Sequence, residues 1–401
     1  MSNYLYSKRL TKDLLGSETR KLKYLKTLID KSKELDCSIS EKFPISYFGN
    51  ENEDLRIRGV KVLIEGFDAI DSEKMDIMAK YKDIKYVEVN DKKQIVLQFQ
   101  CEDEIVEAHS IYSFFDEFLE VFDAAKYINY CIRNNYTDVI EKNINWLLFL
   151  NAENEEKQYR LLIDTDDTWG VRGVTSKIYK NYDNSIVLYL SLLSLHKYSV
   201  EKNKFYHINF TSITDSSINI FFEQDEPVDV PNVGKVYMGL AVSNGEIRNC
   251  KFKAELRYRI ENPVNSASFS AVFNNPVFSI MHNMNVQTID MQLEKLFNLE
   301  ELESNMMSFV ERLNTSENLS EDSLYYLITD LLEKIKDCSD ISKKTKDEFK
   351  KIEVENMIQD TFTLISLFGK LNMISTDVDE KIFIERIYHI VISDLLNKRN
   401  G

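Results

Sequence analysis

The sequence predicts an α+β protein, in which a central, mostly antiparallel sheet packs with helices and a C-terminal helical bundle follows. Four short runs rich in β-branched and aromatic residues follow one another between residues 205 and 260, and consecutive strands favour antiparallel pairing. From Ile289 onward this β pattern ends and apolar residues recur at helical spacing. The change of periodicity therefore places the helical bundle after the sheet.

Length and composition predict more than one packed unit. The chain has 401 residues, whereas a single core rarely extends past roughly 250 residues. A hydrophobic fraction of 43%, with 23 Phe and 21 Tyr, is ample for packed cores, and only 5 Pro and 11 Gly argue against long disordered tracts. We expect an N-terminal α+β region over residues 1–150, a central α+β domain over 151–285 and a C-terminal helical region over 286–401.

The N-terminal region should begin with a basic amphipathic helix over residues 18–35, because Leu22, Leu25 and Leu28 recur there. Residues 8–33 contain nine Lys or Arg against three Asp or Glu, so the segment carries +6 (9 − 3) in a chain whose formal net charge is −16. A uniformly negative surface repels phosphate backbones, so any nucleic-acid site must be a local basic patch.

The elements that follow can be read from periodicity and turn residues. Alternation from residue 57 to 64 predicts a strand, and the runs at 86–89 and 95–99 flank a turn as in a hairpin. Residues 111–150 lack Gly and Pro and predict two helices broken near Asn134 and Asn135. The next elements expected are a strand at 159–163, a turn at 164–170, a helix from Asp183 or Asn184 to about His196, strands at 205–213, 218–222, 236–242 and 250–260, and C-terminal helices separated at 314–316, near 338–339 and at 375–376.

The cysteines and the hydropathy pattern indicate a reducing compartment and no membrane span. Five cysteines lie far apart and form no C-x-x-C pair, so we expect free thiols. No run of 18 apolar residues occurs, and no charged segment precedes an apolar stretch at the start of the sequence.

Three segments resemble a known family. Residues 171–184 read V-R-G-V-T-S-K-I-Y-K-N-Y-D-N, residues 237–247 read Y-M-G-L-A-V-S-N-G-E-I before a basic strand, and residues 357–396 contain two helical patterns around an acidic break. In this order they resemble the phage- and plasmid-type proteins grouped as domain of unknown function 932, over residues 155–397. The chain departs from that family after the basic strand, where Ile260-Glu261-Asn262-Pro263 replaces a Cys-Asn-Gly element, and it lacks the N-terminal W-H-G-L-G patch.

Catalytic and metal-binding patterns are absent from the sequence, so we expect a protein that is not an enzyme and holds no cofactor or metal. There is no phosphate-binding loop and no nucleophile elbow, and the five histidines are scattered. Asp164, Asp166 and Asp167 have a spacing that could hold Mg²⁺, but a solvated turn is the favoured interpretation. Gly170 and Gly173 are interpreted as permitting a tight turn after a strand.

Cations interleaved with aromatic residues are the candidate binding site. Such residues suit single-stranded nucleic acid, because bases stack on flat rings while cations meet phosphates. The candidate ligand-binding residues are Arg172, Lys177, Tyr179, Lys251, Lys253, Arg257, Tyr258 and Arg259. We expect Arg172 and Tyr179 to lie near Arg257 or Arg259 on one concave surface. The alternative is that the basic strand simply has one solvated face.

Together with the family resemblance, these residues predict a non-catalytic binding protein of a phage or other mobile element, with single-stranded nucleic acid as the first candidate ligand. The alternative is a virion structural protein, or a host-directed, anti-defence protein that binds other proteins. We expect a homo-oligomer without membrane association, in the host cytoplasm or within a virion.

Overall fold

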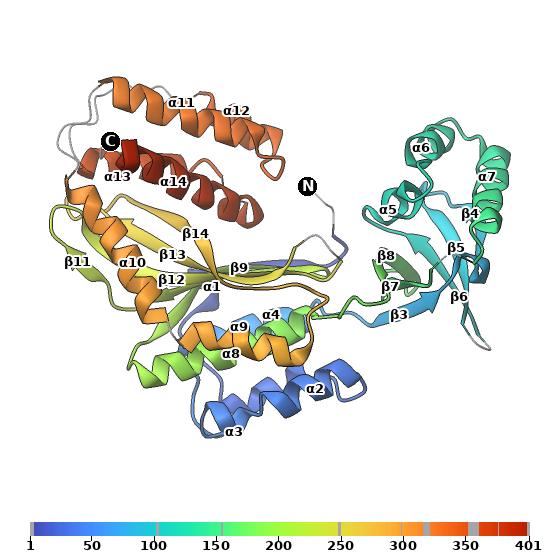
Figure 1. Cartoon of the computed structure of the whole chain (residues 1–401), viewed down its shortest axis with the longest axis horizontal. Coiled ribbons are helices and arrows are strands. Elements are labelled where there is room, and N and C mark those ends of the chain that lie inside the picture. Colours follow the sequence, from blue (N-terminus) through green and yellow to red (C-terminus); the bar gives the residue numbers. More distant parts are fainter. Residues whose placement is uncertain are drawn as a thin grey trace.

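The computed structural model describes residues 4–101, 104–153, 155–247, 250–297, 299–315, 321–351, 361–375 and 377–398. It contains two sheets, each with its own helices: a large unit around an eight-stranded sheet and a small unit around a six-stranded sheet (Figure 1). The predicted α+β class is confirmed, with mostly antiparallel pairing in both sheets and helices toward the C-terminal end.

The large sheet is built from strands of the N-terminal and central parts of the chain. Its strand order is β1(Ser7–Thr11), β9(Tyr206–Thr214), β10(Ser217–Gln224), β12(Gly234–Gly245), β13(Phe252–Glu261) and β14(Ser268–Ile280), with β11(Val228–Val230) beside β12 and β2(Ile57–Arg58) beside β9. Only the short β2–β9 pair is parallel among these. The four strands predicted between residues 205 and 260 are confirmed as β9, β10, β12 and β13, whereas β14 was not predicted.

Helices cover both faces of this sheet (Figure 1). On one face lie α8(Asn184–Glu201) and α9(Val286–Phe297), and on the other lie α13(Thr361–Asn372) and α14(Val378–Lys398). Because α8 is packed on several sides, nearly all of its residues are buried, as expected for a helix that is apolar all round. The predicted helix start at Asp183 or Asn184 is correct, and the helix runs to Glu201 instead of ending near His196.

The N-terminal segment packs beneath α8 and differs from its prediction. The expected helix over residues 18–35 is replaced by a 3-10 helix, η1(Leu22–Leu28), and by α2(Glu34–Lys42). The three leucines of η1 are spaced by three residues, which matches the 3.0-residue turn of a 3-10 helix better than 3.6. The strand expected at residues 57–64 is also wrong beyond Arg58, because α4(Val60–Asp68) buries Val60, Leu63, Ile64 and Phe67, a helical stripe.

The small unit takes its strands from both sides of residue 150. Its strands are β3(Lys74–Ala79), β4(Ile84–Val89), β5(Ile95–Cys101), β6(Glu104–Ser110), β7(Lys157–Ile163) and β8(Trp169–Ser176), in the order β3-β7-β8-β6-β5-β4. Its helices are α5(Phe114–Glu120), α6(Ala125–Arg133) and α7(Thr137–Leu150), so three helices occupy the stretch where two were expected. The hairpin predicted around residues 90–93 is confirmed by the antiparallel pairing of β4 with β5.

The boundaries of the two units differ from the expected domains. Apolar side chains between Met75 and Val174 form one hydrophobic core, and those between Leu10 and Phe67 join those between Tyr182 and Leu396 in the other. The expected boundary at 150/151 therefore cuts through the six-stranded sheet, because local periodicity does not tell which strands pair.

The remaining described elements are short or C-terminal: α1(Lys12–Leu15), α3(Ile45–Phe48), η2(Tyr81–Asp83), α10(Leu299–Glu311), η3(Arg312–Thr315), α11(Glu321–Asp337) and α12(Lys343–Phe349). After Ile280, the part of the chain that the structure describes contains helices and no strand. The expected helix break near Cys338 is confirmed between α11 and α12, and the other two expected breaks include Ser316 and Thr376, which lie outside the described residues. No described helix is both long and apolar enough to cross a membrane.

Candidate functional site

The first two family-like segments meet where the small unit joins the large one. Arg172 on β8 and Glu246, just after β12, are both fully buried, and Arg172 Nη1 lies 2.8 Å from Glu246 Oε2. The same Nη1 donates a hydrogen bond of 2.6 Å to the carbonyl oxygen of Asp215, at the β9–β10 turn. Arg172 thus ties the small sheet to the end of the large sheet, and its guanidinium does not face solvent.

Other residues of the two segments complete this junction. The backbone N–H of Asn184 donates to Glu246 Oε1 at 2.9 Å, and Asn244 Nδ2 donates to Asn184 Oδ1 at 3.0 Å. Lys74 Nζ lies 3.1 Å from Glu246 Oε1. Burial alone would raise the pKa of the Glu246 carboxyl, but the cations of Lys74 and Arg172 bring it below its usual value.

Asp183 extends the buried charges of this junction. Its carboxylate accepts a hydrogen bond of 2.7 Å from Arg160 Nη2 and lies 3.1 Å from Lys33 Nζ. Burial opposes ionisation, yet the Arg160 and Lys33 cations hold the pKa of Asp183 well below its ordinary value. Arg160 and Lys33 were not among the predicted site residues, since nothing in the local sequence indicates their distant partner.

The glycines of the signature permit close packing and do not form a turn. Gly170 and Gly173 both lie inside β8, so the predicted tight turn is wrong. A Cβ atom added to Gly173 would lie 3.1 Å from Ile247 Cβ, and one added to Gly170 would lie 2.9 Å from Ile111 Cδ1. Gly173 therefore lets the residue after Glu246 approach β8 closely.

Arg257, Tyr258 and Arg259 are engaged inside the large unit. Arg257 is buried and donates from Nε and Nη2 to the two carboxylate oxygens of Glu385 on α14, both at 2.8 Å. Tyr258 Oη lies 3.2 Å from His389 Nδ1 on the same helix. Arg259 donates to both oxygens of Glu223, at 3.0 and 2.9 Å. These residues hold α14 and β10 to β13 and are not presented to a ligand.

Arg172 and Tyr179 do not adjoin Arg257 or Arg259, so that expectation is wrong. Arg257 is paired with Gly239 on β12, six residues before Gly245. At about 3.3 Å per residue this separates the two regions by roughly 20 Å along the strand. The alternating sequence pattern predicted that the basic residues share one face of a strand. How far apart they lie along the sheet depends on the strand register, which the pattern does not give.

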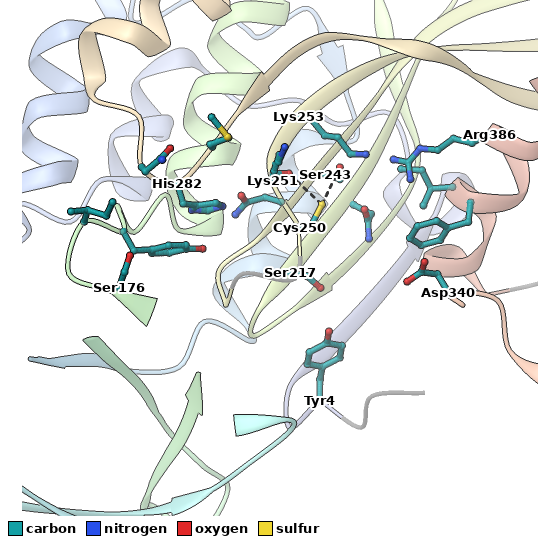
Figure 2. A pocket seen from close by; sticks show the side chains of 18 residues that line it. Tyr4, Ser176, Ser217, Ser243, Cys250, Lys251, Lys253, His282, Asp340 and Arg386 are labelled. Atoms are coloured by element: carbon teal, nitrogen blue, oxygen red, sulfur yellow. Dashed lines mark hydrogen bonds between the residues drawn. The ribbon is translucent and has the colours of Figure 1, made fainter. Parts of the chain in front are cut away.

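An open cleft of about 1010 Å³ lies between the end of the large sheet, the junction loops and the C-terminal helices (Figure 2). Three predicted residues, Tyr179, Lys251 and Lys253, line it. The cleft is also lined by Ser217, Asn219, Ser243, Asp340, Phe383 and Arg386, together with Cys250 and His282. Lys177 is exposed outside the cleft, where its ammonium lies 2.9 Å from Glu156 Oε2.

The floor of the cleft is a cross-strand row of polar side chains. Asn219 on β10 pairs with Ser243 on β12, which pairs with Lys253 on β13. Directly opposed residues share one face of a sheet, so the three side chains lie side by side on the face toward α14. The neighbouring row on that face consists of Phe221, Ala241 and Glu255. The first two pack with Ile382 of α14, and Glu255 pairs with Arg386 of the same helix.

The cations of the cleft differ in how strongly they are neutralised. Lys251 is exposed. Arg386 donates to both oxygens of Glu255, with Nε 3.0 Å from Oε1, and Lys253 Nζ lies 3.3 Å from Glu255 Oε2. Glu255 therefore faces two cations, Arg386 and Lys253, so this group keeps a net positive charge, and Asp340 is the acidic residue on the rim.

Tyr179 lines the cleft on the side of the junction, and contacts with His282 and Glu246 hold it in place. Its ring stacks on the His282 imidazole, with centroids 4.7 Å apart and planes 3° from parallel. Its hydroxyl donates to the Glu246 carbonyl oxygen at 3.2 Å. Burial lowers the pKa of His282, so the imidazole is neutral at pH 7.

In the acidic turn between β7 and β8, the carboxylates of Asp164 and Asp166 have partners within the protein. Asp164 Oδ1 accepts hydrogen bonds from the backbone N–H groups of Asp166, at 2.8 Å, and Thr168, at 3.2 Å. Asp166 pairs with Lys92 at 2.6 Å, and Asp167 adopts a left-handed φ of 57° at the bend. Within the described ranges no three His, Cys, Asp or Glu side chains gather as a metal site would require.

The fold and site define an α+β protein with an open, polar and basic cleft at a junction of two units. A scan against protein-family models, a search of curated proteins and a search of solved structures each gave no match.

Proposed function

We propose that the protein is a non-catalytic binding protein of a phage or other mobile element, and that its cleft binds single-stranded nucleic acid. The observation that carries the proposal is that Lys251, Lys253 and Tyr179 gather on one open cleft with a polar floor. Lysines attract phosphates and an aromatic ring offers a stacking face, which is the combination that unstructured strands require. In a chain of net charge −16, such a local basic site is what allows a polyanion to approach.

The mobile-element part of the proposal depends on the two family-like segments. Distinctive residues of the two segments contact one another: Arg172 forms an ion pair with Glu246, and Asn244 donates a hydrogen bond to Asn184. A shared structural role gives a physical reason for the two motifs to occur together in one chain. Arg172, being fully buried, then has a structural role, and the proposed ligand site consists of the cleft residues, with Lys251 and Lys253 as its lysines.

Binding can be measured by the fluorescence anisotropy of a labelled oligothymidylate of about fifteen nucleotides. We expect the affinity to fall by roughly tenfold between about 50 and 200 mM salt, because each of the few phosphate contacts displaces counterions. Lys251→Glu and Lys253→Glu should each weaken binding and together abolish it, whereas Lys235→Glu, which makes the same charge change as either single variant at the exposed far end of β12, should leave binding unchanged. Folded protein that binds no oligonucleotide at low salt would contradict the proposal.

A second candidate function is protein interaction, and the exposed face of α7 favours it. Trp146, Phe149 and Leu150 are 59%, 68% and 59% exposed at positions that share one side of the helix. The rings of Trp146 and Phe149 stack with centroids 5.6 Å apart. Sedimentation of the wild type and of Trp146→Glu tests the expected homo-oligomer, since loss of assembly in the variant would assign this face to self-association.

A further inference from the structure

Resting on the self-association given above as the second candidate function, we propose that two copies of the chain pair through α7, with the two helices antiparallel about a two-fold axis. The axis passes between Trp146 and Phe149 of each helix. Each copy then offers the same face to the other, so assembly stops at a dimer.

The outer side of α7 carries one stripe of exposed side chains. Its members follow one another at spacings of three or four residues, so they lie in line along the helix: Asp138, Lys142, Trp146, Phe149 and Glu153. Glu153 lies in the turn directly after α7. The opposite side of the helix buries Ile140, Ile144 and Leu148 in the core of the small unit. The described part of the chain therefore leaves the stripe open to solvent.

The stripe is symmetric in position and opposite in charge at its two ends. Lys142 precedes Trp146 by four residues, and Glu153 follows Phe149 by four residues. A half-turn of one copy about an axis between the two rings therefore places Trp146 against Phe149 of the second copy. The same half-turn places Lys142 against Glu153 of the second copy. Two equivalent ion pairs then flank four aromatic rings, whereas a parallel pair would bring like charges together.

The charges around these pairs are complementary as well. Asp138 lies one helical turn before Lys142. Near the other end, Lys82 Nζ lies 3.3 Å from Glu153 Oε1, and Lys80 Nζ lies 3.6 Å from Glu153 Oε2. An antiparallel pair therefore brings Asp138 of each copy toward the two lysines of the other copy.

The size of the face predicts a weak dimer. Trp146, Phe149 and Leu150 are 59%, 68% and 59% exposed. At about 200 Å² for a large side chain, this amounts to roughly 400 Å² of apolar surface per copy. The two copies together then bury less apolar area than the roughly 1,200 Å² at which stable complexes begin, so the dimer should dissociate on dilution. Because α7 lies at the end of the small unit away from the large unit, pairing leaves both clefts open (Figure 1).

The first test is sedimentation equilibrium of the full chain between about 5 and 500 µM, a range that suits a weak interface. We expect a monomer–dimer equilibrium for the wild type and monomer alone for Trp146→Glu and for Phe149→Glu. Tyr325→Glu places the same charge at a side chain on α11 that is 70% exposed, and it should dimerise as the wild type does. A wild type that stays monomeric would overturn self-association itself, and one that grows past two copies would overturn the two-fold axis. Binding of oligonucleotide to the cleft is measured separately and does not depend on either result.

The second test concerns the antiparallel arrangement and uses the double variant Lys142→Glu with Glu153→Lys, which keeps the net charge. One end of the stripe then carries two negative charges, and the other end carries three positive charges together with Lys80 and Lys82. In an antiparallel pair these ends face each other, so the dimer should be at least about fivefold tighter than the wild type at about 20 mM salt.

The matched control makes the same exchange at two exposed positions of α12, Lys344→Glu with Glu348→Lys, and should leave dimerisation unchanged. A parallel pair would bring like ends together in the α7 double variant. Weaker or unchanged dimerisation of that variant, with loss of the dimer in Trp146→Glu, would therefore overturn the antiparallel arrangement and leave self-association through α7 intact.

Discussion

Arg172 and Glu246 form a fully buried ion pair, 2.8 Å between Nη1 and Oε2, that joins a strand of the small sheet to the end of a strand of the large one. Removing one partner of such a pair leaves an uncompensated charge without water, which typically costs about 3–5 kcal/mol. We expect Arg172→Met to lower the free energy of unfolding by that amount in urea titrations. Lys26→Met, which breaks the exposed pair with Glu51, should cost less than about 1 kcal/mol.

The double variant Arg172→Met with Glu246→Leu distinguishes a pair from two independent residues. Since neither charge then remains buried alone, its loss should be smaller than the sum of the two single losses. Additive losses would show that each residue stabilises the junction through other neighbours, such as Asp215 or Lys74.

A second prediction concerns acid stability through His389. This imidazole is buried on α14 among Phe273 and Phe309, with ring centroids 4.6 and 4.7 Å away, and burial lowers its pKa to about 4. In the unfolded chain the group takes up a proton near pH 6.5, but in the folded chain only near pH 4, so the unfolded state binds more protons between these values. Stability is therefore fully present above about pH 6.5 and falls as the pH is lowered to about 4, by up to about 3 kcal/mol.

The check is the free energy of unfolding between pH 7 and pH 4 for the wild type and for His389→Phe. The variant removes the titrating group while keeping a ring, so its stability should decline less over this range. Parallel curves for the two proteins would mean that His389 does not control the decline.

A third prediction compares two glycines in strands. A Cβ at Gly173 would lie 3.1 Å from Ile247 Cβ, a side-chain atom that can shift, whereas a Cβ at Gly239 would lie 2.0 Å from the Phe222 carbonyl oxygen of the neighbouring strand. Gly173→Ala should cost about 1–3 kcal/mol by overpacking. Gly239→Ala should cost more, because backbone must move, and thermal unfolding of the two variants measures the order. A more stable Gly239→Ala than Gly173→Ala would contradict this account.

Periodicity correctly predicted those elements whose local sequence pattern fits only one type of secondary structure. The strands β9, β10, β12 and β13 and the start of α8 were found in this way. The segment of α4 contains two patterns. Val60, Val62 and Ile64 alternate as in a strand, whereas a helical stripe of apolar residues continues to Phe67. The structure follows the longer, helical pattern. Pairing of β1 with β9 joins segments about two hundred residues apart, which no local pattern reveals.

The same limit applies to the candidate site. Lys251, Lys253, Arg257 and Arg259 alternate in one run of sequence, yet the first two line the cleft, whereas Arg257 pairs with Glu385 and Arg259 with Glu223 away from it. Glu385 lies 128 residues from Arg257 along the chain, so its role could not be inferred from the basic strand itself. What distinguishes a cation that lines the cleft from one that holds α14 is thus a partner far along the chain.

The last prediction concerns Arg257, which the sequence analysis named as a candidate ligand-binding residue and which the structure places in an ion pair with α14. Arg257 is buried and donates twice to Glu385, and Lys381 and Arg386 of the same helix also face this side of the sheet. Arg257→Glu would place two carboxylates together out of water, so α14 should detach from the sheet. Hydrogen exchange of α14 amides should then speed up by at least about tenfold relative to α8, and a second substitution, Glu385→Arg, should partly restore protection. Unchanged protection of α14 in Arg257→Glu would show that apolar contacts such as Ile382 with Phe221 hold the helix without this ion pair.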